Sequence, residues 1–89
     1  MVKRLLITGD VQGVGFRYSL IFAAKKLGLA GWVRNRWDGS VEAVVQGDEE
    51  SVKDLIAWAW KGPDMATVKH VEVTEEAGHY TGFELKDTV

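Results

Sequence analysis

Residues 31–46 read GWVRNRWDGSVEAVVQ, and this stretch decides the fold class of the 89-residue chain. Apolar and polar residues alternate on both sides of Trp37-Asp38-Gly39, which is the pattern of two strands joined by a three-residue loop. We expect a type I turn closed by Gly39 in a left-handed conformation, with Arg36 paired to Ser40. The stretch is therefore predicted to form an antiparallel hairpin.

The register of this hairpin follows from the polarity of its side chains, because a shift by one residue would turn every side chain to the opposite face. The register places Val33 and Asn35 on one face, together with the apolar residues of the second strand. Arg34, Arg36 and Glu42 are placed on the other face. The first face is apolar apart from Asn35, and we expect it to contact the core.

The flanking elements complete an arrangement in which strands and helices alternate. A short strand at Leu5-Leu6-Ile7 precedes a helix from Arg17 to Leu27, and a second helix follows the hairpin, with Asp48 as its N-cap and Gly62-Pro63 after its end. The order β-α-β-β-α-β predicts an α+β fold of the ferredoxin-like type, in which two helices cover one face of an antiparallel sheet. One further strand is expected to run through Val68, through His70 or Val71, and through Val73. A short extra strand is expected at Phe83-Glu84-Leu85.

Composition and charge narrow the possible functions. The chain is 46% hydrophobic, has no cysteine, and carries 11 Lys and Arg against 13 Asp and Glu, a net charge of −2. These values predict one cytoplasmic globular domain over residues 1–89, without disulfides, thiolate catalysis or a zinc–cysteine site. The first apolar run is too short for a signal peptide or a membrane span. The negative charge disfavours nucleic acid and anionic membranes as partners, and we expect a monomer.

The two helices begin with different chemistry. The second begins with acidic side chains, whereas the first is entered through Val11-Gln12-Gly13-Val14-Gly15-Phe16-Arg17, without a capping side chain. Gly13 and Gly15 permit backbone angles that turn successive N–H groups inward to form an anion nest, and the helix dipole adds positive potential. Arg17 adds a permanent charge with donors suited to phosphate oxygens. The pattern predicts a pocket for one phosphoryl group, although the glycine spacing by itself also fits a plain tight turn with Arg17 in solvent.

Asn35 is the second candidate site residue, because it is a polar side chain on the face expected to be buried. An unsatisfied buried amide costs about 1–3 kcal/mol, so Asn35 must find partners. In one interpretation it bonds the backbone of the hairpin loop and is structural. In the other, its oxygen accepts a hydrogen bond from a water molecule and its amide donates to a substrate oxygen, which would position a nucleophile.

Two motifs of this sequence, GDVQGVGFR at residues 9–17 and GWVRNRWDGSVEAVVQG at residues 31–47, resemble those of the acylphosphatase family. The resemblance spans nearly the whole chain and includes GPDMA at residues 62–66. It implies one acylphosphatase-like domain that hydrolyses the carboxyl-phosphate bond of acyl phosphates to a carboxylate and inorganic phosphate. The resemblance further implies that Arg17 and the backbone N–H groups of residues 12–17 in the first motif hold phosphate or a similar oxyanion, and that Asn35 orients water. Asp10 departs from the basic or neutral residue usual in the family, and we expect its carboxylate to face solvent.

No metal or other cofactor is expected, because Arg17 and backbone N–H groups supply positive charge and a carboxylate leaving group needs no strong general acid. The residues also leave two alternative functions open. Trp32 beside Arg34 and Arg36 could stack on RNA bases, but the strands that carry ring platforms in an RNA-recognition sheet lack aromatic residues here. The other alternative is a small-ligand regulatory module, which can share the same fold.

Overall fold

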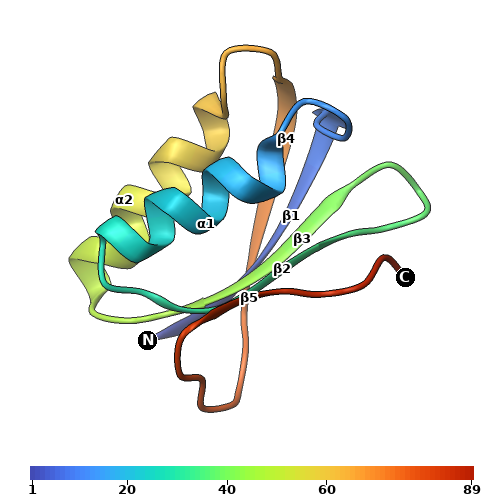
Figure 1. Ribbon diagram of the computed structural model, residues 1–89. Helices are drawn as coiled ribbons and strands as arrows, with labels where there is room; N and C mark the ends of the chain where they lie inside the picture. The colour runs from blue at the N-terminus through green and yellow to red at the C-terminus, as the bar shows by residue number, and fades with distance from the viewer.

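The computed structural model describes all 89 residues and consists of two helices packed on one face of a five-stranded sheet (Figure 1). The predicted order of strands and helices is confirmed. Neither helix has the length and apolar character needed to cross a membrane. The elements in chain order are β1 (Val2–Asp10), α1 (Phe16–Lys26), β2 (Ala30–Asn35), β3 (Val41–Gln46), α2 (Glu49–Lys61), β4 (Thr67–Glu75) and β5 (Phe83–Leu85).

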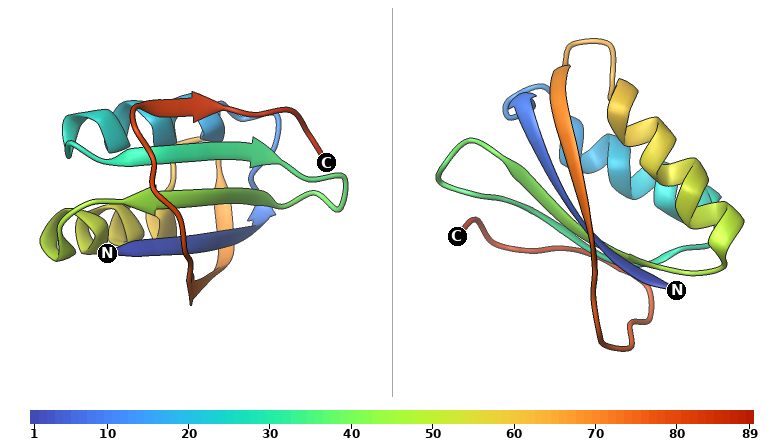
Figure 2. Two further views of the ribbon diagram at one scale, coloured as in Figure 1. Left: turned by 90° about the horizontal axis from the view of Figure 1, so that it is seen from below. Right: turned by 180° about the vertical axis from the view of Figure 1, so that it is seen from behind.

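The sheet has the strand order β4-β1-β3-β2-β5 and is mixed. The four longer strands pair antiparallel, as predicted, whereas β5 pairs parallel to β2. The direction of β5 follows from the topology, because β4 runs opposite to β1 and β2, and the chain reverses once more before β5. The connection between β4 and β5 passes from one edge of the sheet to the other (Figure 2, left).

Strand β1 is the element whose length differs most from the prediction. It covers nine residues, whereas the sequence predicted only the apolar run Leu5-Leu6-Ile7. The strand lies between β3 and β4 and pairs with both of them, so its backbone hydrogen bonds continue past the apolar run on each side. Pairing with two neighbours therefore extends the strand over residues whose own sequence pattern is weak.

The core lies between the helices and the sheet and confirms the predicted hairpin register. Asn35 pairs with Val41, and Arg36 N–H donates to Ser40 O at 2.9 Å across the three-residue loop. Gly39 has a φ of 94°, as the predicted turn requires. The core residues contributed by β2, β3 and the helices are Val33, Val41, Ala43, Val45, Phe16, Leu20, Ala24, Val52, Leu55 and Ala59.

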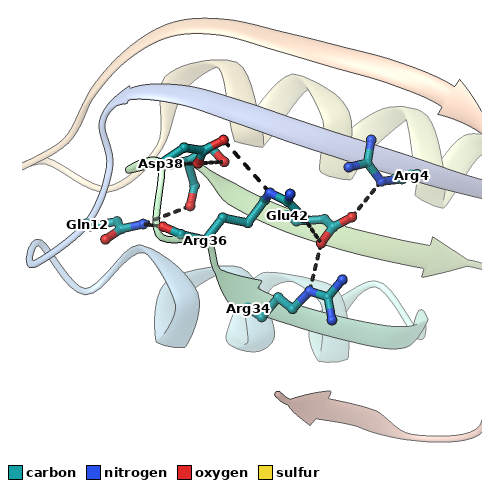
Figure 3. A network of polar contacts seen from close by, with 7 residues as sticks. Arg4, Gln12, Arg34, Arg36, Asp38 and Glu42 are labelled. Carbon is teal, nitrogen blue, oxygen red and sulfur yellow. Dashed lines mark hydrogen bonds and ion pairs between the residues drawn. The ribbon is translucent and has the colours of Figure 1, made fainter. Parts of the chain in front are cut away.

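The face of the sheet away from the helices holds a cluster of Glu42 with Arg4, Arg34 and Arg36, called the Glu42 cluster below (Figure 3). The Glu42 carboxylate accepts hydrogen bonds from Arg4 Nε at 2.6 Å and Arg34 Nε at 2.7 Å, and Arg36 Nη1 lies 3.3 Å from its Oε1. The side chain of Glu42 is only 5% exposed. Because Arg4, Arg34 and Glu42 come from β1, β2 and β3, the cluster joins three adjacent strands.

The charge state of Glu42 depends on these partners. Burial alone would raise the pKa of this carboxyl, but the hydrogen bonds from Arg34 and Arg4 outweigh burial and hold the pKa below its ordinary value of 4.5. A carboxyl group with a lowered pKa stabilises the fold above its unfolded-state pKa, and this contribution is lost as the pH falls through the folded-state pKa. The cluster therefore stabilises the sheet at neutral pH and weakens in acid.

We predict that Glu42→Gln lowers the free energy of unfolding at neutral pH by about 2–3 kcal/mol, because three guanidinium groups lose their shared carboxylate. The difference from the wild type should shrink as the pH falls from neutral through and below 4.5, the ordinary pKa of the carboxyl, because the wild-type carboxylate then becomes protonated. Urea unfolding across this range measures both effects. Glu75→Gln is the control, since exposed Glu75 pairs only with Lys3 and its loss should cost less than about 0.5 kcal/mol. Equal losses in the two variants would contradict the role given to Glu42.

Candidate active site

The loop between β1 and α1, residues 11–15, has the backbone conformation that the glycine pattern predicts. Gly13 and Gly15 have φ values of 75° and 77°, and both residues are exposed. Gly15 is the N-cap of α1, and no side chain caps the N–H groups of the first turn. A Cβ atom at either glycine would meet nothing within 4 Å beyond the glycine's own chain neighbours. The backbone at the start of α1 is therefore open to a ligand, and its N–H donors suit an anion.

Buried side chains hold both ends of this loop. Val11 and Phe16 are each only 1% exposed, and half-buried Val14 packs against the core. The Phe16 ring meets the ring of Trp58 on α2 edge to face, with 5.4 Å between their centroids. The loop is thus fixed by apolar packing at its start and its end, while the glycines between remain accessible.

Arg17 is the arginine of this chain without an ionic partner. The other three arginines all pair with Glu42, whereas Arg17 forms no salt bridge and no side-chain hydrogen bond within the protein. The first turn of α1, where Arg17 lies, contains no acidic residue. The first turn of α2 contains Glu49 and Glu50, and its N-cap Asp48 accepts a hydrogen bond from Ser51 N–H at 2.8 Å. Acidic side chains therefore compensate the positive charge at the start of α2, whereas the positive charge at the start of α1 remains uncompensated.

Asn35 is the last residue of β2, and its backbone is held on both sides. It pairs with Val41 of β3, and its carbonyl oxygen accepts a hydrogen bond from Val89 N–H at 3.3 Å. Trp37 N–H in turn donates to Val89 O at 2.8 Å. The side-chain oxygen Oδ1 of Asn35 is buried and accepts no hydrogen bond from the protein. This leaves a fixed acceptor able to receive a hydrogen bond from a small donor such as water.

The side chain of Gln12 joins the loop to the hairpin that carries Asn35. Gln12 Nε2 donates to Arg36 O at 2.7 Å and to Ser40 O at 2.8 Å (Figure 3). The sequence predicted Gln12 to lie among the phosphate-binding residues 12–17, called the phosphate loop below. It did not indicate the contact with the hairpin, because the two acceptors are backbone atoms 24 and 28 residues away along the chain. Asp10, at the end of β1, is exposed as expected.

Other features of the surface lie outside this arrangement. A groove of about 680 Å³ between α1 and α2 includes Tyr18, Phe22 and Trp58 in its lining, but neither the loop glycines nor Asn35.

Trp32 lies on the outer face of the sheet as predicted, but it is only 9% exposed. Its ring is covered by Arg34 and Lys86, whose cationic groups lie 4.7 and 4.9 Å from the ring centroid. It does not present a free face on which an RNA base could stack. The structure brings no three His, Cys, Asp or Glu side chains together in a group that could hold a metal ion.

Comparison with known proteins agrees with the two motifs and with the fold. The profile of the acylphosphatase family matches residues 3–85. An acylphosphatase of Thiobacillus denitrificans is 58% identical over 80 residues, which cover 90% of each chain. The crystal structure of acylphosphatase from Bacillus subtilis has a TM-score of 0.91 at 35% identity, covering 97% of this chain and 99% of that one. An acylphosphatase structure from Coxiella burnetii has a TM-score of 0.92 at 37% identity, covering 96% of this chain and 90% of that one. The chain therefore belongs to the acylphosphatase family, and its activity is the hydrolysis of acyl phosphates.

Proposed function

We propose that the phosphoryl group of the substrate binds to Arg17 and to the backbone N–H groups of residues 12–17, and that Asn35 orients the water molecule that attacks it. The observation that carries this proposal is the buried Oδ1 of Asn35, which accepts no hydrogen bond within the protein. Leaving a buried acceptor unpaired costs about 1–3 kcal/mol, and a role in which Oδ1 pairs with a water molecule beside the substrate accounts for an acceptor that the protein itself does not pair.

Two properties of the loop support phosphate binding there. The positive φ angles of Gly13 and Gly15 and the uncapped start of α1 offer backbone donors to an anion. Arg17 has no carboxylate partner, so an incoming phosphoryl group does not have to displace one. A guanidinium group can donate two parallel hydrogen bonds to phosphate oxygens. Binding therefore needs no metal ion to supply the positive charge.

Asn35 supplies the second part of the reaction. Its Oδ1 accepts a hydrogen bond from water and directs the water oxygen toward phosphorus. The water oxygen forms a new bond to phosphorus, while the bond between phosphorus and the acyl oxygen breaks and its electron pair leaves with the carboxylate. The proton lost by the water is released with the products. Because a carboxylate is a stable leaving group, the reaction requires positioning and charge stabilisation and no strong general acid.

Gly15→Val tests the phosphate loop, with Gly28→Val as its matched control. Both glycines have similar positive φ angles, 77° and 72°, and neither has a protein atom near the position of an added Cβ. The strain should therefore be similar and destabilise each variant by about 1–3 kcal/mol. Only Gly15→Val should weaken competitive inhibition by inorganic phosphate, by about tenfold or more, because its side chain covers the donors. If phosphate inhibits Gly15→Val as strongly as the wild type, the loop is only a tight turn and does not bind phosphate.

Alanine substitutions separate the roles of Arg17 and Asn35. Arg17→Ala should weaken phosphate inhibition and also lower kcat by about 10²–10³, because it removes a charge that acts in binding and in the transition state. Asn35→Ala should lower kcat strongly while the inhibition constant for phosphate stays within about threefold of wild type. Arg17→Lys should restore little, since an ammonium group cannot form the two-pronged contact.

The control for the change in charge is Arg36→Ala, which removes an arginine from the outer face of the sheet and should leave phosphate inhibition unchanged. Thermal unfolding of each variant shows whether lost activity reflects lost fold. If Asn35→Ala lowers Tm but keeps wild-type kcat per folded molecule, Asn35 is a structural residue of the hairpin and the proposed role in orienting water is wrong.

A further inference from the structure

The two parts of the proposed site lie on different elements, and the side chain of Gln12 provides the hydrogen bonds between them. The phosphate loop connects β1 to α1, whereas Asn35 ends β2 next to the hairpin loop. No backbone hydrogen bond joins residues 11–15 to residues 36–40. The only hydrogen bonds between them run from Gln12 Nε2 to Arg36 O and Ser40 O, at 2.7 and 2.8 Å (Figure 3).

The chemistry of this contact needs a primary amide. Both bonds come from one nitrogen, which carries two hydrogens and can give one to each carbonyl oxygen. The two carbonyl groups flank the hairpin loop, because Arg36 and Ser40 are the residues that close it. Arg36 directly follows Asn35 in the chain. A displacement of the hairpin relative to the loop would therefore move the Asn35 amide relative to a phosphoryl group bound at residues 12–17.

The loop keeps its own shape without this contact. Val11 and Phe16 are buried at its two ends, and Phe16 packs against Trp58. The conformation of the glycines follows from their own backbone freedom. Loss of the Gln12 amide should therefore leave the backbone donors in place and change chiefly the position of the hairpin.

We propose that Gln12 is a positioning residue whose side chain sets the distance between the bound phosphoryl group and the Asn35 amide. Its side chain acts on turnover through Asn35 and contributes little to phosphate affinity. This inference rests on the proposed function, in which Asn35 orients the attacking water.

The test uses Gln12→Met, which keeps the length and volume of the side chain but removes the donor. Gln46→Met is the matched control, because Gln46 also forms two side-chain hydrogen bonds to backbone atoms, here of Tyr80. Gln46 lies at the end of β3 farthest from the hairpin loop. Both substitutions are made in the wild type and in Asn35→Ala. The measurements are kcat with acetyl phosphate, the inhibition constant of inorganic phosphate, and Tm.

In the wild-type background, Gln12→Met should lower kcat by about tenfold or more, because small displacements of a positioned group cost large factors in rate. The inhibition constant for phosphate should stay within about threefold, and Gln46→Met should keep kcat within about twofold of wild type. In the Asn35→Ala background, Gln12→Met should lower kcat by less than about twofold further, because the group it positions is already absent. If Gln12→Met does not fold, Gln12→Asn, whose amide is one methylene short of the carbonyls, is tested against the same expectations.

Wild-type kcat in Gln12→Met would overturn this inference, and so would an equal loss of kcat with and without Asn35. A loss of phosphate inhibition as large as the loss of kcat would also overturn it, since Gln12 would then act on binding. Failure of the proposed function has a different signature. In that case Asn35→Ala alone would retain wild-type kcat, whatever Gln12→Met does.

Discussion

The register of the β2–β3 hairpin is the constraint on which the rest of the site depends. Pairing of Asn35 with Val41 turns Asn35 toward the helices and turns its neighbours Arg34 and Arg36 toward the opposite face. A slip of one residue would reverse all three. The buried Glu42 carboxylate opposes such a slip, because it holds both arginines on the outer face, and the apolar face of β3 opposes it from the core side. The Glu42 cluster, on the face of the sheet away from the helices, thereby fixes the direction of the Asn35 side chain.

The distribution of charge separates the three arginines of the Glu42 cluster from Arg17, the arginine proposed to bind phosphate. Arg4, Arg34 and Arg36 surround one buried carboxylate and contribute to stability. Arg17 stands at an uncapped helix start without a carboxylate, where the dipole and the backbone donors add to its charge. This difference explains how a chain with a net charge of −2 can offer a site for an anion. The positive potential is confined to the start of α1, because Arg17 is the one arginine without a carboxylate partner.

Local sequence predicted the features that depend on neighbouring residues. The alternation of polarity predicted the hairpin register, and Gly39 predicted the turn. Asp48 predicted the start of α2, and the absence of a capping side chain predicted the open start of α1. What the sequence did not predict depends on partners far along the chain. The full length of β1 comes from pairing with β3 and β4, and the parallel pairing of β5 comes from the path of the chain. The hydrogen bonds of buried Glu42 and those of Gln12 likewise connect residues on different strands and loops, and no local sequence pattern predicts them. In the candidate site, the residues could therefore be named from the sequence, but the link between the loop and Asn35 could not.

Amide NMR of the ¹⁵N-labelled protein tests most directly whether the phosphoryl group binds at the start of α1, as proposed. On titration with inorganic phosphate, the backbone amide signals of residues 12–17 and the side-chain amide of Asn35 should shift together with one dissociation constant. The amides of Glu49 and Glu50, at the capped start of α2, should not shift. If the signals that move belong instead to the groove around Phe22 and Trp58, or to the Glu42 cluster, phosphate binds elsewhere and the account is wrong.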